Sequence, residues 1–226
     1  MKSRYYFFFF LFSVGVVFAQ GNSTIRLQKY AMLKVTDQIA ISLTKGNENK
    51  LVLIDANTDE LSINQNNGLL KLSKTQNNYA TRTTLNATLY YTDDLSFIDA
   101  SENAQIRSNE IMKASHLDIR AQEAGVIHLA IENQSVNIRS NTSSEIRLKG
   151  STKTQEVMVN TMAKVYNKSL KTESSTATVL AGGIAEIYAS QNMTARVKAG
   201  SIVRIYGHPK KVTKEDTFGG EIKMMN

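Results

Sequence analysis

Short stretches of alternating apolar and polar residues recur along the chain about every twenty residues. Each stretch starts with Ile or Val, carries small or bend-favouring residues next, and reaches a second apolar residue eight positions after the first. Such self-similarity is typical of a solenoid, in which equivalent residues stack on one another. We therefore predict an all-β fold, a right-handed parallel β-helix with about six short rungs. The rungs start at Ile98, Ile119, Ile138, Val157, Val179 and Val197.

The last two repeats are nearly copies of each other and argue against a β-sandwich. "VLAGGIAEIYA" (179–189) and "VKAGSIVRIYG" (197–207) share the same order of apolar, small and aromatic residues. A sandwich also has short strands at regular spacing, but it does not require one residue class at one register six times. The only proline, Pro209, follows the last rung, where it removes no ladder hydrogen bond.

The segments before and after the repeats differ from them in pattern. Residues 20–94 alternate apolar and polar positions but are interrupted by turn-rich stretches such as "KGNEN" and "NQNNG". We predict that they form an N-terminal β segment that starts or caps the solenoid. Residues 95–207 hold the repeats, and residues 208–226 form a C-terminal cap strand. No linker divides 20–226, which we expect to form one integrated domain.

The first nineteen residues have the pattern of a secretory signal peptide. A basic start with Lys2 and Arg4 precedes the apolar run "YYFFFFLFSVGVVF" and a small-x-Ala site that ends at Ala19. The expected location is the periplasm, the outer surface or the extracellular space, with no integral membrane segment after cleavage. Cleavage leaves 25 basic and 20 acidic residues, a net charge of +5. The basic residues are scattered, which argues against a nucleic-acid partner.

Residues that carry catalytic or metal chemistry are sparse. The chain has no cysteine, and His116, His128 and His208 lie far apart, so we predict no metal and no cofactor. The two aspartates of the repeats, Asp99 and Asp118, fall in different registers and do not form an acid/base pair. We therefore expect that the protein is not an enzyme. The third hypothesis is a polysaccharide-active enzyme, because several enzymes of this class have a β-helix fold.

One outward-facing position of the repeat carries aromatic and cationic side chains that are suited to binding a ligand. Nine residues after the rung starts, aromatic and cationic side chains would form a ladder if the rungs stack. Stacked aromatic and guanidinium groups bind sugar rings or extended polymers. The alternative is that the ladder only stabilises the solenoid through cross-strand contacts. The predicted ligand-binding residues are Arg107, His128, Arg147, Tyr166, Tyr188 and Tyr206.

The chain resembles a known family in three places. These are "LSINQNNGLLKLS" (61–73), the entry into the repeats "LSFIDASENAQI", and the ending "IYGHPKKVTKEDTFGGEIKMM". The pattern is similar to the putative auto-transporter adhesin, head GIN domain family of Bacteroidetes-type bacteria, over about residues 25–225. That family usually places glycines at each bend. Here only the last two bends keep them, and asparagines such as Asn141 and Asn160 stand at earlier ones, where Asn tolerates left-handed backbone angles.

Two functions from different classes follow. The first is a non-catalytic envelope or surface module, adhesin-like as the resemblance implies, that binds a glycan or an envelope or host protein through a solenoid face. The second is a structural or scaffolding periplasmic protein without a discrete ligand. Surface exposure favours the first function and periplasmic retention favours the second. The oligomeric state is left open.

Overall fold

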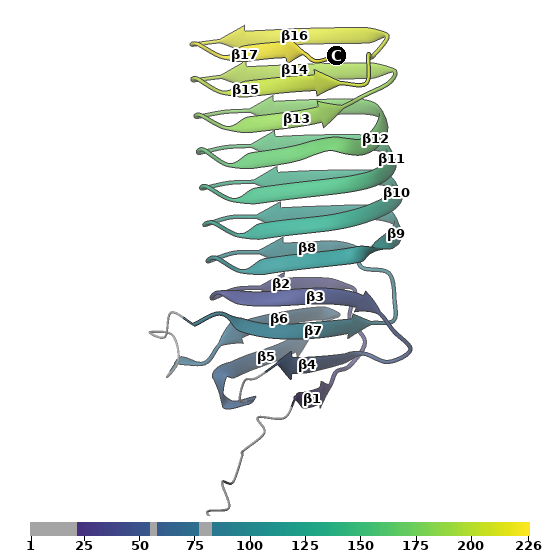
Figure 1. Cartoon of the computed structure of the whole chain (residues 1–226), viewed down its shortest axis with the longest axis vertical. Helices are drawn as coiled ribbons and strands as arrows, with labels where there is room; N and C mark the ends of the chain where they lie inside the picture. Colours follow the sequence, from purple (N-terminus) through teal and green to yellow (C-terminus); the bar gives the residue numbers. More distant parts are fainter. Residues whose placement is uncertain (1–21, 55–57, 77–82) are drawn as a thin grey trace, which may run out of the picture.

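The chain folds into a single stack of β-coils, as predicted from its repeats (Figure 1). The computed structural model describes residues 22–54, 58–76 and 83–226, so the predicted signal peptide lies outside the described residues. From β8 onward the chain makes about seven right-handed turns. In Figure 1 it runs along the front of the stack, turns behind it and returns one level higher. The predicted all-β solenoid is confirmed.

Seven strands and one 3₁₀ turn form the N-terminal end of the stack, and ten strands follow them. The first group is β1 (Ser23–Arg26), β2 (Met32–Val35), β3 (Ile39–Lys45), β4 (Lys50–Ile54), the 3₁₀ turn (Thr58–Glu60), β5 (Leu61–Asn66), β6 (Leu69–Lys74) and β7 (Leu85–Tyr91). The second group is β8 (Phe97–Ala100), β9 (Gln105–Ala121), β10 (Val126–Ser140), β11 (Glu145–Val159), β12 (Lys164–Val179), β13 (Ile184–Tyr188), β14 (Asn192–Lys198), β15 (Ile202–Tyr206), β16 (Lys211–Thr217) and β17 (Glu221–Met224).

The N-terminal coils do not stack in sequence order. Strand β2 pairs in parallel with β6 on one side and β8 on the other, and β3 lies in the same way between β7 and β9. The coil formed by β2 and β3 comes first in the sequence, but in space it lies between the β6–β7 coil and the β8–β9 coil. Three antiparallel strands finish this end, since β4 pairs with β7, β1 with β4, and β5 with β6. The N-terminal end of the stack is therefore covered by antiparallel strands, whereas the coils above it pair in parallel.

The core is a set of apolar columns that run along the stack. Inward and outward residues alternate along each strand, so every second side chain is buried. One column contains Ile98, Ile119, Ile138, Val157, Ala177 and Ala195, each paired with the next and at most 1% exposed. Apolar burial of this kind is the main source of stability in a chain without cysteines.

The register of the last two predicted rungs was wrong by two residues. Val179 and Val197 stack on Val159, whereas Val157 pairs with Ala177. A slip of one residue would have turned the apolar side chains outward, but a slip of two keeps the same face inside. Because both Val157 and Val159 are buried and apolar, alternation alone could not distinguish the two registers.

The β2–β3 coil and the coils from β8 onward turn at one edge through two consecutive residues with left-handed backbone angles. In the middle coils these pairs are Thr142–Ser143 and Thr161–Met162, and only the last bends use glycine. The asparagines expected at these angles lie one position earlier. The bends are held by their neighbours: Ser143 N–H donates to the Thr161 carbonyl at 3.0 Å, and Met162 N–H donates to the Ala181 carbonyl at 3.0 Å.

At the opposite edge, β9 to β12 run continuously around the corner and enclose polar side chains. Gln155, 3% exposed, is the centre of this polar network. Its Nε2 lies 3.0 Å from Thr172 Oγ1, 3.1 Å from Ser175 Oγ and 3.1 Å from the Tyr188 carbonyl oxygen. Its Oε1 accepts a hydrogen bond from Asn167 Nδ2 at 3.1 Å. Buried polar groups are tolerated where they find partners in this way.

The last coil differs from the others in what it places over the core. Strand β16 pairs in parallel with β14, so Lys214 takes the position above Ala195, and Asp216 takes the position above Val197. Both lower residues are fully buried, whereas Lys214 and Asp216 are exposed. Charged residues thus stand on the core side of the final coil.

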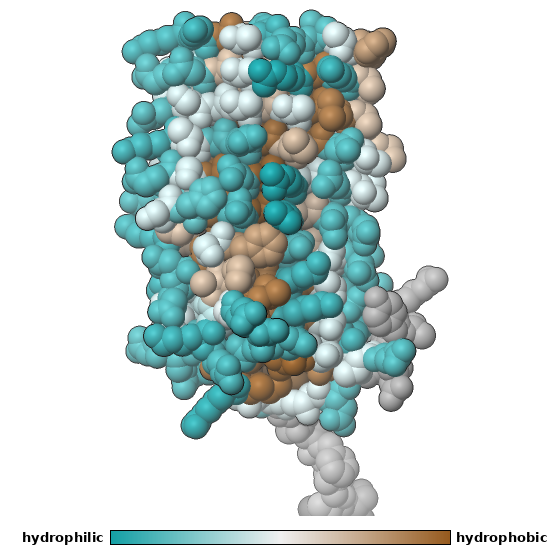
Figure 2. All heavy atoms as spheres, turned by 180° about the vertical axis from the view of Figure 1, so that it is seen from behind, coloured by the Kyte–Doolittle hydropathy of each residue, from teal (hydrophilic) through white to brown (hydrophobic). Residues whose placement is uncertain are grey.

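The rear face of the stack is mostly hydrophilic. Seen from behind, polar and charged residues cover most of the face, and hydrophobic residues show mainly as a narrow band along the stack (Figure 2). Over residues 22–54, 58–76 and 83–226, no helix has the length and apolar character that crossing a membrane requires.

Candidate functional site

A cleft of about 280 Å³ opens on one flank of the solenoid across four successive strands. Four of the six residues predicted from the outward register line it: Arg107, His128, Arg147 and Tyr166. They are consecutive partners in the parallel ladder from β9 to β12. We call this feature the flank cleft. Its other lining residues are Ser108, Asn109, Leu129, Leu148, Lys149, Lys168 and Ser169.

Irregular strand pairing coincides with the flank cleft. The β9–β10 register shifts after the pair Arg107 and His128, and the β11–β12 register shifts after the pair Arg147 and Tyr166. Such bulges bend a strand and re-aim its side chains. At the second shift the Leu148 N–H donates to Oδ1 of the buried Asn167 at 3.1 Å. The Asn167 side chain therefore supplies a backbone hydrogen bond at this irregularity, beneath the floor of the cleft.

Glu145 links two residues of the flank cleft. His128 Nε2 lies 2.9 Å from Glu145 Oε1, and Arg147 Nη2 donates to the same oxygen at 3.2 Å. Burial raises the pKa of Glu145, but the hydrogen bonds from His128 and Arg147 outweigh burial, so the pKa lies below its usual value. Glu145 is therefore ionised at neutral pH, and it fixes the two side chains in neighbouring positions.

The Arg147 guanidinium also contacts Tyr166. It lies 4.8 Å from the centre of the Tyr166 ring, a distance at which cation and ring attract each other. Arg107 makes a neutral contact instead, since its Nη2 donates to Gln105 Oε1 at 3.1 Å. Within the described parts of the chain, Arg107 has no carboxylate within ion-pair distance.

The remaining two predicted residues do not join the ladder. Tyr166 pairs with Glu186, and Glu186 pairs with Arg204, so these take the next two places. Tyr188 and Tyr206 pair with each other two residues further along the strands. The predicted single ladder of six is therefore two separate groups. The reason is the two-residue slip in register described above, which left both tyrosines outward but displaced them along the strand.

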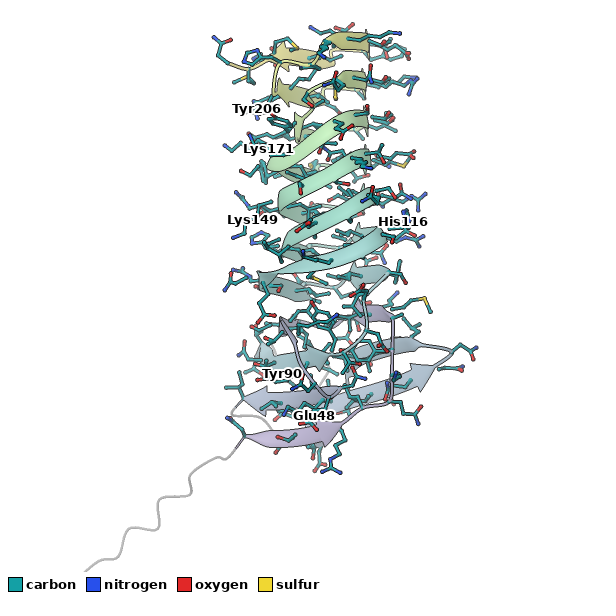
Figure 3. The ribbon with its side chains drawn as sticks, turned by 90° about the vertical axis from the view of Figure 1, so that its right-hand side faces the viewer. Glu48, Tyr90, His116, Lys149, Lys171 and Tyr206 are labelled. Atoms are coloured by element: carbon teal, nitrogen blue, oxygen red, sulfur yellow. The ribbon has the colours of Figure 1, made fainter. Side chains whose placement is uncertain are left out.

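The displaced tyrosines interact with lysines of β12. Lys171 Nζ lies 4.2 Å from the centre of the Tyr188 ring, and Lys168 Nζ lies 6.0 Å from that of Tyr206. Tyr188 also lines a second, shallower hollow of about 440 Å³ around the corner of the coils. Lys149, Lys171 and Tyr206 follow one another up the same flank, and His116 lies on the opposite side (Figure 3).

Sequence reasoning missed two cations of the flank cleft, Lys149 and Lys168. Both lie two positions beyond a ladder residue, Lys149 after Arg147 and Lys168 after Tyr166, where a strand presents the same face again. The period of two was therefore a signal that could have found them.

In the described segments, no group of three or more His, Asp or Glu side chains could hold a metal ion. Asp99 pairs in register with Arg120, and Asp118 pairs with Phe97, so the two aspartates stand at different levels along the strand as predicted. His116 lies 2.8 Å from Ser135 Oγ and 3.4 Å from Asp118, away from the flank cleft.

Several solved structures share this fold. A putative adhesin from Bacteroides fragilis superposes with a TM-score of 0.79 at 14% identity, covering 90% of this chain and 96% of that one. A putative adhesin from Parabacteroides merdae gives 0.71 at 13% identity, covering 91% and 96%. A protein described as a putative lipid binding protein, from Parabacteroides distasonis, gives 0.67 at 12% identity over the same shares. At these identities the likeness concerns the fold alone.

A match to a family model agrees with the fold. None of the curated proteins matches the chain. The model of one protein family matches residues 29–209, from just before β2 to the end of the glycine-containing repeats. The match stops at Pro209, so β16 and β17 lie beyond it, although their sequence contributed to the resemblance. The chain belongs to the family described as putative auto-transporter adhesin, head GIN domain.

Proposed function

We propose that the protein is an exported, non-catalytic module of the cell envelope or surface that binds a glycan in the flank cleft. One observation carries the proposal: side chains chosen from the outward register alone, Arg107, His128, Arg147 and Tyr166, line one hollow. Concave sites with a few convergent polar groups are the usual form of a ligand site. The family description and the signal-peptide pattern of residues 1–19 support export and a binding role.

The second hypothesis, a scaffold without a discrete ligand, also has an observation in its favour. His128, Arg147 and Glu145 satisfy one another, and Arg147 packs on Tyr166. Contacts of this kind between neighbouring strands stabilise a sheet whether or not a ligand binds. The two hypotheses differ in what happens when the ladder is removed.

A paired binding and stability experiment separates the two functions. The mature chain carrying Arg147→Ala and Tyr166→Ala is compared with the native sequence on a glycan array and in urea unfolding. The control is Arg139→Ala, because Arg139 lies in the other half of β10, beyond the corner. A binding module loses glycan signal in the double variant and keeps it in the control. A loss of stability with unchanged binding, or no binding by any form, favours the scaffold.

The location is tested on intact cells. Producing cells are treated with a protease while a periplasmic protein is followed as the leakage control. Cleavage of this chain with survival of the control supports surface exposure and an adhesive role. Survival of the chain until the outer membrane is opened places the search for its ligand among periplasmic glycans and envelope components.

A further inference from the structure

The charges of the flank cleft are strongly one-sided. Four of its lining residues carry a permanent positive charge (Arg107, Arg147, Lys149 and Lys168), and no carboxylate is among the eleven lining residues. Two carboxylates stand just outside it. Glu145 pairs with Arg147 at 3.2 Å, and Glu186 pairs with Lys168 at 3.6 Å.

Two of the four cations keep their charge unneutralised. Among the described residues, neither Arg107 nor Lys149 forms an ion pair with a carboxylate, and both are exposed. The Arg107 guanidinium donates instead to the neutral amide oxygen of Gln105. A cation at the mouth of a cleft with no protein partner attracts an anionic group of a ligand, and the low-dielectric walls of the cleft strengthen that attraction.

The spacing of the arginines suits a repeating polymer. Arg107 and Arg147 share one register with His128 between them, so they lie two coils apart. At about 4.8 Å between neighbouring strands, this separation along the stack is roughly 10 Å. An extended polysaccharide advances by a similar length over two sugar units. A chain that lies along the solenoid axis can therefore present an anionic group to each arginine in turn.

The neutral lining residues match the rest of such a chain. Ser108, Asn109 and Ser169 offer hydroxyl and amide groups that can donate and accept hydrogen bonds from sugar hydroxyls. A volume of about 280 Å³ lies just below the usual range for ligand pockets, which suits a short stretch of one chain rather than a nucleic-acid duplex. The scattered basic residues elsewhere on the protein also do not favour a duplex.

We propose that the flank cleft selects an acidic polysaccharide, which lies along the solenoid axis with carboxylate or sulfate groups at Arg107 and Arg147. The selection rests on the proposed glycan-binding function. Guanidinium groups are suited to this task because they bind a carboxylate or sulfate through two parallel hydrogen bonds. Lys149 adds a point charge at the opening of the cleft.

The test compares two polymers that have the same backbone and a different charge. Polygalacturonate and its methyl ester share one backbone, and their binding to the mature chain is measured by calorimetry at low and moderate salt. We expect the acidic form to bind at least tenfold more tightly and to weaken as salt rises. Arg107→Gln and Arg147→Gln should each weaken it about tenfold, and Arg139→Gln, away from the cleft, should not. Alginate and chondroitin sulfate extend the panel to other anionic sugars.

Each other outcome contradicts one proposal specifically. Equal binding of the ester, unaffected by the arginine variants, overturns charge selection but leaves glycan binding intact. Failure of every acidic and neutral polysaccharide to bind overturns the glycan-binding function itself. Equal binding of duplex DNA that is lost in Arg107→Gln shows a surface for any polyanion and also overturns selection of a polysaccharide. Unfolding curves of each variant establish that a lost signal is not a lost fold.

Discussion

Replacing Gln155 by alanine tests whether the corner depends on its buried polar network. The Gln155 amide nitrogen has three acceptors within 3.1 Å, and its oxygen accepts from Asn167. Two N–H groups and one oxygen give about three hydrogen bonds, each with a net contribution of about 1 kcal/mol. The substitution also leaves the Asn167 Nδ2 group buried without its acceptor. We expect the free energy of unfolding to fall by about 3–4 kcal/mol.

A double-mutant cycle isolates the contact between the two amides. Asn167→Ala removes the donor to Gln155 and also the acceptor for the Leu148 N–H, so alone it should cost about 2–3 kcal/mol. Combined with Gln155→Ala, it should cost about 1–2 kcal/mol less than the sum of the two single changes, because the shared hydrogen bond can be lost only once.

The assay is urea unfolding followed by far-UV circular dichroism, with Gln134→Ala as a matched control. Gln134 lies on β10 and is exposed, so its loss should change stability by less than about 0.5 kcal/mol. A cost below about 1 kcal/mol for Gln155→Ala, or strict additivity in the cycle, would show that water replaces the network freely. The reasoning about buried partners would then be wrong.

Three further changes test the backbone and the charges. Gly150→Ala should lower the free energy of unfolding by about 3–5 kcal/mol, because φ is +113° and a Cβ would lie 2.1 Å from the Ile131 carbonyl oxygen. The control is Gly68→Ala, in open space at φ +76°, which should lower it by about 1 kcal/mol. Thr161→Gly should increase the free energy of unfolding by up to about 1 kcal/mol, because glycine adopts the left-handed backbone angles of this position more readily than a β-branched residue. The melting temperature should rise accordingly, and an unchanged or lower value contradicts this. Burial raises the pKa of Asp99 despite Lys34, so the native state loses stability relative to the unfolded chain as pH rises above about 4. The stability advantage of Asp99→Asn should therefore grow between pH 4 and pH 7 in urea unfolding, and a constant or shrinking difference refutes it.

The repeats predicted the solenoid because a stack requires the same residue class at the same place in every coil. Ile98, Ile119 and Ile138 could be matched directly, and the structure stacks them. The slip at Val179 shows the limit of this reasoning. Hydrophobic alternation fixes which face is inside, but it does not fix how far a strand is displaced along its neighbour by an even number of residues.

The order of the N-terminal coils could not be predicted from the pattern. Strands β2 and β6 both carry apolar residues at alternate positions, and both can pair with any coil that presents a free edge. Which of them contacts β8 depends on the path of the chain through β4 and β5, and nothing in the alternation specifies that path. The sequence therefore indicated a β segment at this end but not the placement of one coil between two later ones.

The candidate site was predicted in part for the same reason. Arg107, His128, Arg147 and Tyr166 belong to coils whose register was right, and they line the flank cleft together. Tyr188 and Tyr206 belong to the coils whose register slipped. Lys149 and Lys168 lie two residues beyond Arg147 and Tyr166, so the period of two could have added both, although a bulge in the β11–β12 pairing places Lys149 beside Ser169.

The charged residues of β16 affect what can stack on the last described coil. A parallel stack can in principle continue with another chain, because its final strands present unpaired backbone groups above an apolar core. Lys214 and Asp216 place a cation and an anion where the next coil would need to bury apolar side chains. A second molecule that docked there would have to desolvate both. Charges on the core side of β16 thus oppose the docking of another molecule on this coil, while the flank cleft, on the side of the stack, stays open to a ligand.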